Sequence, residues 1–409
     1  MGISLGLVGL GAFGSTFADL FRRHPVVDRV ALCDREPQRI RVFADRPDWA
    51  DKFSPRDAYD SLDAICRADL DALVIITQPW LHAPQCIQAM EAGKHVYSAV
   101  PVIMTPDADE ILGWCDRLIR TAERTGMSYM LGETTFYRPQ TMFCRRKAAE
   151  GAFGDFVYAE GEYFHDVDAG GYTLRQVQEH RETGAAGCEW VQRKAAYRRR
   201  GVLGGPMHYP THSTSGPVAI MNAHAVSVTA QGYRNRTGDP FFDDSAFSNE
   251  TALFRMSNGA VVRICEYREC AGPFHDSETF RIMGTRGAFA ENTWRSNGRR
   301  GSGVLGPDEL QTLTDDAMRD PLPDDVARAW YDPAAGSVAY GGHGGSHAYL
   351  VHEFVDAVAA ARLPAINAWQ AVRYMAMGAV AHQSALRDGE TLAVPDWGDG
   401  PAQVRRPGP

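Results

Sequence analysis

The stretch GLVGLGAFG at residues 6–14 leaves the apolar segment 3–8 and enters a glycine turn. Its spacing is GxGxxG: Gly9 allows a tight turn, Gly11 lets a ligand approach the backbone, and Gly14 permits close packing of the following helix. The amides at the start of such a helix are free to bind phosphate oxygens. The stretch therefore predicts a strand, a turn and a helix that together bind a dinucleotide.

An acidic residue completes this pattern. Asp34 stands 20 residues after Gly14, at the end of the apolar run 27–33. A carboxylate at this place accepts hydrogen bonds from ribose hydroxyls and repels a 2′-phosphate, which favours NAD over NADP. The adjacent Arg35 argues the other way, because a guanidinium pairs with phosphate. We expect NAD as the cofactor.

Two regions with different patterns follow one another along the chain. Up to about residue 130, short apolar runs alternate with helical patterns, which predicts a Rossmann domain with a parallel sheet over residues 1–132. Strand-like runs separated by turns then predict an α+β domain with a largely antiparallel open sheet over residues 133–397. The expected fold class is α/β. The runs of the second domain are strands at 156–163, 224–232, 251–256, 260–267 and 278–283, and helices at 347–361 and 369–387.

Three segments lack either pattern. Residues 166–205 contain many glycines and arginines, and residues 295–345 are rich in Gly, Asp and Pro. Long loops inside compact domains are functional or disordered, so we expect irregular structure in both segments. Residues 398–409 are expected to form a mobile tail.

Composition and charge argue against several classes of function. The 409 residues carry a formal net charge of -9, which disfavours a broad surface for nucleic acid or for an anionic membrane. No apolar run approaches the roughly 20 residues that a membrane-spanning helix needs. Because no secretory signal is visible at the start of the chain, we expect a cytoplasmic location. The eight cysteines are scattered without metal-ligand spacing, so no metal site is expected.

Further motifs give the chain a family resemblance. Besides residues 6–14 and Asp34-Arg35, they are TQPWLH at 77–82, AGKHVYSAVPVIMT at 92–105 and SALRDGE at 384–390. With these motifs the chain resembles the glucose-fructose oxidoreductase / inositol dehydrogenase / MocA family over nearly its whole length. The resemblance implies a carbohydrate substrate between the two domains, over the nicotinamide, and a homo-oligomer (dimer or tetramer) packed through the open sheet face. It also implies cofactor contacts from Gly9, Gly11, Ala12, Phe13, Gly14, Asp34, Arg35, Thr77, Gln78, Pro79, His82, Ala99, Val100 and Pro101.

The chain departs from the dehydrogenases of this family. Where they carry Glu-Lys-Pro, with the lysine moving the proton of the oxidised hydroxyl, this chain reads Ala99-Val100-Pro101, and valine cannot transfer a proton. The string Tyr209-Pro210-Thr211-His212 resembles instead the family's branch of NAD-dependent glycoside hydrolases, whose known example activity is α-N-acetylgalactosaminidase. The stretch EYFHD at 162–166 is similar to a Tyr/His segment of that branch.

The resemblance to this branch implies a reaction that returns NAD unchanged. A hydride leaves carbon 3 of the sugar, the proton on carbon 2 becomes acidic, the aglycone departs from carbon 1, water adds, and the hydride returns. Two alternatives are a net NAD-dependent sugar or polyol dehydrogenase and a non-catalytic sugar or NAD sensor. The candidates for the proton transfers are Tyr209, His212, His165 and Tyr163.

Substrate contacts are expected from His208, Arg138, Arg198 and Arg199. His208 stands where many dehydrogenases of the family carry an aspartate. The basic run 193–200 suits an anionic sugar, because arginine forks bind carboxylate, sulfonate or phosphate; a solvated surface is the alternative. The glycine-rich residues 341–347 either close over the substrate or start the following helix.

Overall fold

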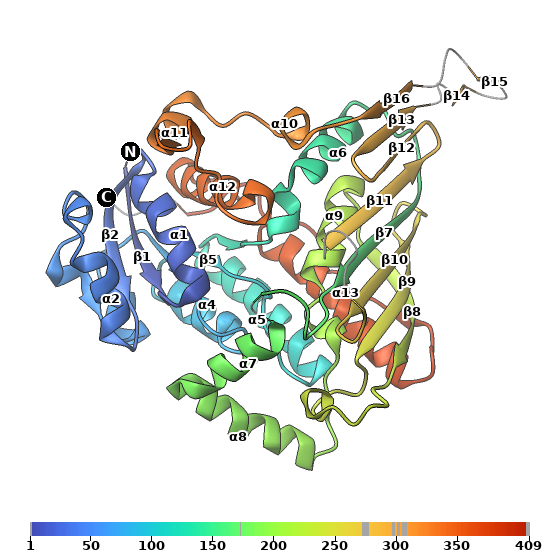
Figure 1. Ribbon diagram of the computed structural model, residues 1–409, viewed down its shortest axis with the longest axis horizontal. Coiled ribbons are helices and arrows are strands. Elements are labelled where there is room, and N and C mark those ends of the chain that lie inside the picture. Colours follow the sequence, from blue (N-terminus) through green and yellow to red (C-terminus); the bar gives the residue numbers. More distant parts are fainter. Residues whose placement is uncertain are drawn as a thin grey trace.

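The computed structural model describes residues 2–171, 173–271, 278–296, 299–300, 303–304 and 309–405. Figure 1 shows two sheets at opposite sides of the molecule, with a layer of helices between them. The chain completes the first sheet before it begins the second, and its last two long helices return to the space between the sheets.

The N-terminal part forms a Rossmann domain of alternating strands and helices, as predicted. Its six strands are all parallel, in the order β3-β2-β1-β4-β5-β6. They are almost wholly apolar because a parallel sheet with helices on both faces is buried on both sides. The elements are β1 (Ile3–Val8), α1 (Ala12–Arg23), β2 (Val27–Cys33), α2 (Pro37–Ala44), β3 (Ala58–Tyr59), α3 (Leu62–Cys66), β4 (Ala72–Ile75), α4 (His82–Glu91), β5 (His95–Ser98), α5 (Ala108–Thr125) and β6 (Tyr129–Leu131).

The second domain is built on a nine-stranded open sheet. Its elements are α6 (Pro139–Ala149), β7 (Phe156–Phe164), α7 (Leu174–Thr183), α8 (Ala185–Arg199), α9 (Thr211–Met221), β8 (Ala225–Tyr233), β9 (Asn249–Met256), β10 (Val261–Tyr267), β11 (Glu278–Gly284), β12 (Gly287–Ala290), β13 (Thr293–Ser296), β14 (Arg299–Arg300), β15 (Gly303–Val304), β16 (Glu309–Thr312), α10 (Asp315–Met318), α11 (Asp324–Ala329), β17 (Tyr331–Asp332), β18 (Ser337–Val338), α12 (Ser346–Ala360), α13 (Ala368–Leu386) and β19 (Leu392–Ala393). Short 3-10 turns are η1 (Pro47–Trp49), η2 (Pro55–Asp57), η3 (Thr134–Tyr137), η4 (Pro206–His208), η5 (Pro240–Phe242) and η6 (His343–Gly345).

The order of strands in this sheet is β16-β13-β12-β11-β7-β10-β9-β8-β19. β7 and β10 pair in parallel, whereas the other neighbouring strands pair antiparallel. The prediction of a largely antiparallel open sheet is therefore confirmed. One face is covered by helices: α9 lies on β7 and β11, and α13 packs between β8 and the Rossmann helix α5.

Helix α9 is the main element that the sequence pattern did not predict. Nearly all of its residues are buried, so it shows no alternation of polar and apolar faces, and it contains Pro217. The helix lies directly on the backbone of β7: a methyl group added at Gly161 would come within 1.8 Å of the Ser213 carbonyl oxygen. This close contact holds the start of α9 over the sheet.

The prediction of irregular structure for residues 166–205 is wrong, because this segment contains the helical hairpin α7–α8. Thr173 begins α7 with a capping box in which its side chain and that of Gln176 bond reciprocally to the backbone. The periodicity is invisible in the sequence because α7 buries none of its residues, so it has no apolar stripe to detect.

Residues 295–345 are only partly irregular. The described part contains β16, α10, α11 and the short β17–β18 pair, whereas residues 297–298, 301–302 and 305–308 lie outside the described residues. In the predicted tail, the Arg405 amide donates to the Gly126 carbonyl at 2.8 Å, and residues 406–409 lie outside the described residues. Among the described helices, none combines the length and the apolar character needed to cross a membrane.

Candidate active site

The glycine turn after β1 forms a cradle in which side chains are excluded. Gly9 has a φ of 91°, a left-handed conformation that glycine adopts without strain. A methyl group added at Gly14 would lie 2.0 Å from the Gly9 carbonyl oxygen. Helix α1 begins at Ala12, and in the described structure no side chain caps its first amides. These amides are therefore available to an anionic ligand.

Asp34 follows β2 and closes this cradle. Its Oδ2 accepts the Leu10 amide at 2.8 Å, and its Oδ1 accepts the Glu36 amide at 2.9 Å. The carboxylate lines a pocket of about 390 Å³ with Ile40 and Tyr59. Arg35 does not line that pocket; its guanidinium lies 3.5 Å from Glu189 of α8. Of the two side chains, the carboxylate rather than the guanidinium lines this pocket.

The loops after β4 and β5 add polar atoms at the same edge of the sheet. The Gln78 Oε1 and His82 Nε2 atoms are buried and have no hydrogen-bond partner among the described residues. His82 is held by its Nδ1, 2.8 Å from the Pro101 carbonyl oxygen. Val100, at the lysine position of the related dehydrogenases, is buried and apolar. Ligands of open α/β sheets bind at this edge, so the cradle and the orphaned polar atoms fit a dinucleotide.

The four predicted catalytic residues lie together. Tyr163 stands near the end of β7, His165 follows that strand, and Tyr209 and His212 flank the start of α9. The ring centroid of His212 lies 5.0 Å from that of Tyr163 and 5.5 Å from that of Tyr209. The Tyr163 hydroxyl is hydrogen-bonded to His165 Nδ1. Packing of α9 on β7 thus unites two sequence segments that are more than 40 residues apart.

His212 is held in its protonated form. Its Nδ1 lies 2.9 Å from Glu133 Oε1 and 3.9 Å from Glu278 Oε2, and both carboxylates are buried. Burial opposes protonation, but the two carboxylates outweigh it and raise the pKa of His212 to about 9. At neutral pH His212 is therefore a proton donor.

His165 has the opposite character. Burial, together with the positive charges of Arg268 and His212, lowers the pKa of His165 to about 4. The imidazole is neutral at pH 7 and can accept a proton through the hydroxyl of Tyr163. Two groups whose pKa values are displaced in opposite directions form a natural acid and base pair.

The pKa of His212 also predicts a pH-dependent stability. The folded protein binds this proton more tightly than the unfolded chain, so the stabilisation is complete below pH 6.5 and is lost as the pH rises through about 9. We expect the difference in melting temperature between wild type and His212→Gln to shrink from pH 6.5 to pH 9. The control is His224→Gln, at a partly exposed histidine; a constant difference for His212→Gln would contradict the assignment.

Sequence reasoning missed the charged residues around these rings. Glu133 follows β6 and also accepts the Thr135 amide at 2.9 Å. Glu278 begins β11, and the Glu266 carboxylate pairs with Arg268, whose guanidinium lies 4.6 Å from the Tyr163 ring centroid. For Glu133 a signal existed, because it follows the last strand of the Rossmann sheet at its ligand-binding edge. Glu278 and Glu266 sit in strands without any local motif.

The predicted substrate residue His208 lies in a tightly packed place. Its ring centroid is 4.4 Å from that of His382 in α13, and neither ring nitrogen has a hydrogen-bond partner among the described residues. Burial, followed by the neighbouring His382, lowers the pKa of His208 well below its ordinary value. His208 is therefore neutral and packs behind Tyr209.

The three predicted substrate arginines lie in different places. Arg138 reaches the catalytic cluster, because its Nη2 is 2.8 Å from Glu278 Oε2. Arg198 donates to Asp244 at 2.7 Å, and Arg199 is exposed; both belong to α8, and among the described contacts neither side chain reaches the rings of Tyr163, Tyr209 or His212. Of the three, the structure brings only Arg138 to the site.

The glycine-rich residues 341–347 connect the two halves of the site. They lead into α12, and the His343 and His347 ring centroids lie 5.9 Å and 5.8 Å from the Phe13 ring in the glycine turn. The segment therefore starts the following helix, which is one of the two alternatives that the sequence left open. It also lies against the first turn of α1.

Comparison with known proteins finds similarity both to NAD-binding oxidoreductases and to glycosyl hydrolases. Residues 3–133 match the model of an oxidoreductase family with an NAD-binding Rossmann fold. A glycosyl hydrolase family 109 protein of Streptomyces niveus is 28% identical over 432 residues, covering 99% of this chain and 79% of the relative. An alpha-N-acetylgalactosaminidase of Tannerella forsythia is 26% identical and covers 82% of this chain and 72% of that one. The crystal structure of an oxidoreductase domain protein from Kribbella flavida matches with a TM-score of 0.72 at 16% identity, over 97% of this chain and 100% of the other.

The fold and the site define an enzyme of the two-domain, NAD-binding oxidoreductase class. The candidate catalytic rings include His212, which contacts Glu133 just after the last strand of the Rossmann sheet. Residues 3–133 match the NAD-binding part of the glucose-fructose oxidoreductase / inositol dehydrogenase / MocA family, and over nearly its whole length the chain is similar to a glycosyl hydrolase family 109 protein.

Proposed function

We propose that the protein is an NAD-dependent glycoside hydrolase that returns its cofactor unchanged after each reaction. The observation that carries the proposal is the pair of oppositely titrating histidines, His165 and His212, beside a cofactor edge where Val100 replaces the proton-transferring lysine. Bound NAD supplies reversible oxidation of a sugar carbon, which acidifies the neighbouring C–H bond. The similarity to glycosyl hydrolase family 109 proteins over 99% of the chain supports the same reaction type.

The base of this reaction is the Tyr163–His165 pair. The neutral imidazole takes the tyrosine proton, and the tyrosine oxygen in turn takes a proton from the sugar. Such a base takes the proton of the hydroxyl at carbon 3, releases it to solvent, and is then free to take the proton at carbon 2. Arg268, which lies over the Tyr163 ring, stabilises a developing phenolate charge.

The acid of this reaction is His212. When the carbon 1–oxygen bond breaks, its electron pair leaves with the aglycone oxygen, which takes the His212 proton. Glu133 and Glu278 keep the imidazole oriented and hold its pKa high, so that His212 takes a proton back from the attacking water. Water then adds at carbon 1, and the proton removed from carbon 2 is returned, so that the net change is hydrolysis of the glycosidic bond.

The substrate is a glycoside, and an N-acetylated sugar is the first to test because of the Tannerella forsythia relative. The predicted anionic sugar is the second. Two of the three arginines expected to bind its charge are engaged elsewhere, because Arg138 pairs with Glu278 and Arg198 with Asp244; Arg199 is exposed on α8. These ion pairs favour a neutral sugar over a uronic or sulfonated one.

The test is aglycone release without added NAD. We expect the purified protein to cleave an aryl α-N-acetylgalactosaminide without accumulation of NADH, to lose this activity when its NAD is stripped, and to regain it when NAD is restored. Steady NADH formation from free sugars without cleavage would identify a net dehydrogenase instead. Binding of sugar and NAD with neither reaction would identify a sensor.

Two further expectations remain proposals. A homo-oligomer would use the outer face of the nine-stranded sheet, where Leu253, Val261 and Met283 are exposed on β9, β10 and β11; β7 lies between β10 and β11. A cytoplasmic location would suit a reaction that depends on NAD. Sedimentation of the purified protein and fractionation of its host cells test them.

A further inference from the structure

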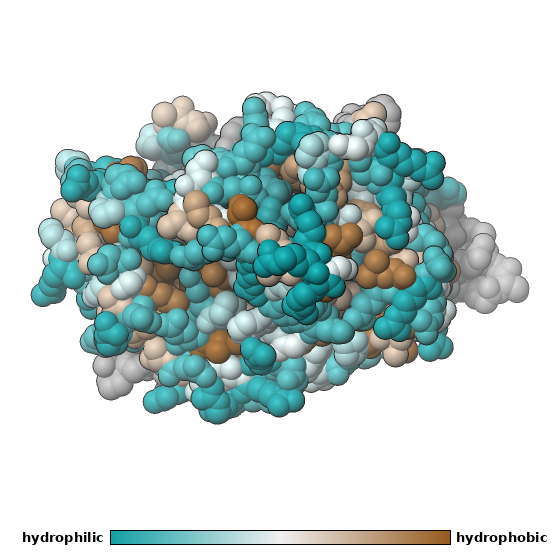
Figure 2. Space-filling view, turned by 90° about the horizontal axis from the view of Figure 1, so that it is seen from below, coloured by the Kyte–Doolittle hydropathy of each residue, from teal (hydrophilic) through white to brown (hydrophobic). Residues whose placement is uncertain are grey.

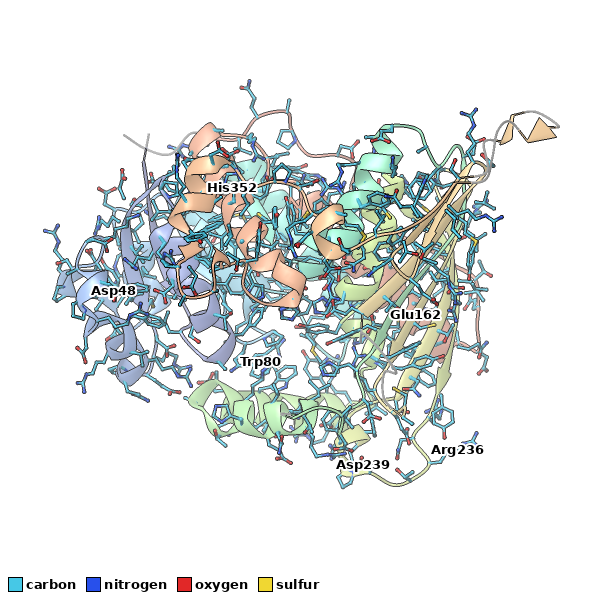
Figure 3. The ribbon with its side chains drawn as sticks, turned by 45° about the horizontal axis from the view of Figure 1, so that its top comes forward. Asp48, Trp80, Glu162, Arg236, Asp239 and His352 are labelled. Carbon is cyan, nitrogen blue, oxygen red and sulfur yellow. The ribbon has the colours of Figure 1, made fainter. Side chains whose placement is uncertain are left out.

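The helical hairpin α7–α8, residues 174–199, reaches from the second domain to the Rossmann domain (Figure 1). Trp190 of α8 stacks on Trp80, with ring centroids 4.7 Å apart and planes inclined by 4°. Figure 3 shows Trp80 between the Rossmann domain and this hairpin. Trp80 belongs to the 77–82 loop that supplies four of the predicted cofactor contacts. The apolar contact that holds the hairpin to the Rossmann domain is therefore made with residues 77–82, which we call the cofactor loop.

Polar contacts extend this attachment on both sides. Arg193 and Tyr197 of α8 both bond to Glu110 at the start of α5. At the other end of α8, Glu189 lies 3.5 Å from Arg35, the residue after Asp34. The hairpin thus spans the ligand-binding edge of the Rossmann sheet from the end of β2 to the start of α5.

The hairpin has few apolar contacts with the rest of the molecule. Helix α7 buries none of its residues, and Trp80, Trp190 and Tyr197 form a small cluster separate from the main core. Figure 2, which views the molecule from the side of the hairpin, shows a largely hydrophilic surface. Segments held by one small cluster and by surface ion pairs open at low free-energy cost. The hairpin can therefore move away from the cofactor edge without unfolding the domains.

We propose that the α7–α8 hairpin is the element that retains NAD. Closure places Trp190 on the cofactor loop, so that NAD leaves only when the hairpin opens. This inference concerns cofactor retention and holds for whichever reaction the site performs. It assigns to α8 a role in retaining NAD rather than in binding an anionic sugar.

The test is the dissociation of NAD from the full-length holoenzyme. We expect Trp190→Ala to raise the dissociation rate about tenfold, because the aromatic stack that holds the hairpin is lost. Trp190→Phe keeps an aromatic face and should keep slow release. Val191→Ala, at an exposed neighbour on α8, is the matched control. The rate is measured by dilution into an enzymatic NAD trap, with the melting temperature as a check on folding; wild-type release from a folded Trp190→Ala protein would overturn the proposal.

Discussion

Replacing His212 by glutamine should lower the rate of glycoside cleavage by about a thousandfold while the protein keeps its NAD. The loss follows because a positioned proton donor contributes about 100-fold to 10,000-fold to a rate. Glutamine keeps a polar group beside Glu133 and Glu278, which limits the penalty of leaving two buried carboxylates without a counterion. The measurement is kcat/KM for an aryl glycoside, combined with the NAD content of each preparation.

Two variants make this result specific. His224→Gln, at a partly exposed histidine after α9, should leave the rate unchanged. Glu133→Gln should shift the alkaline limb of the pH–rate profile to lower pH, because one of the two carboxylates that raise the pKa of His212 to about 9 is gone. Near-normal turnover by His212→Gln would remove His212 from the proposed role of acid.

Replacing Gly14 by alanine should abolish tight NAD binding, with a loss of affinity of about 100-fold or more. The new methyl group would lie 2.0 Å from the Gly9 carbonyl oxygen, a contact between two backbone segments that cannot both keep their positions. Either the glycine turn opens or α1 moves away from β1, and both changes displace the phosphate-binding amides. Titration with NAD, followed by intrinsic fluorescence, measures the effect.

The matched control is Gly113→Ala in α5. There an added methyl group meets nothing within 4 Å, and alanine is favoured over glycine inside a helix by about 0.5–1 kcal/mol. We expect Gly113→Ala to bind NAD normally and to be at least as stable as wild type. If Gly14→Ala also bound NAD with wild-type affinity, the close approach of α1 to the turn would not be needed for the site.

Much of the fold follows from local patterns. The segments 3–8 and 27–33 were predicted with the bounds that the structure has, because buried parallel strands are short apolar runs bounded by turn residues. The hairpin α7–α8 and helix α9 escaped prediction for opposite reasons: α7 buries none of its residues fully, and α9 buries nearly all of its residues. In neither case is there a polar and an apolar side for the sequence to display.

The candidate site was predictable only in part. The cofactor residues around Gly9 and Asp34 belong to a sequence motif. The geometry of the turn fixes the spacing of the residues in that motif, so the sequence alone reveals them. Tyr209 and His212 were found through the family resemblance, whereas Glu133, 79 residues away from His212, was not found at all. The supporting carboxylates come from three different strands or strand ends, and their convergence is a property of the packed sheet.

The sequence by itself determined that the protein has a Rossmann domain with a dinucleotide turn, and that Val100 replaces the proton-transferring lysine. These features are local, because a turn needs particular residues at particular spacings and a valine carries no titratable group. Only the tertiary structure decided which histidine is protonated at neutral pH and which is neutral. A pKa depends on burial and on charges brought close by folding, and His212 and His165 differ in those surroundings rather than in their own chemistry.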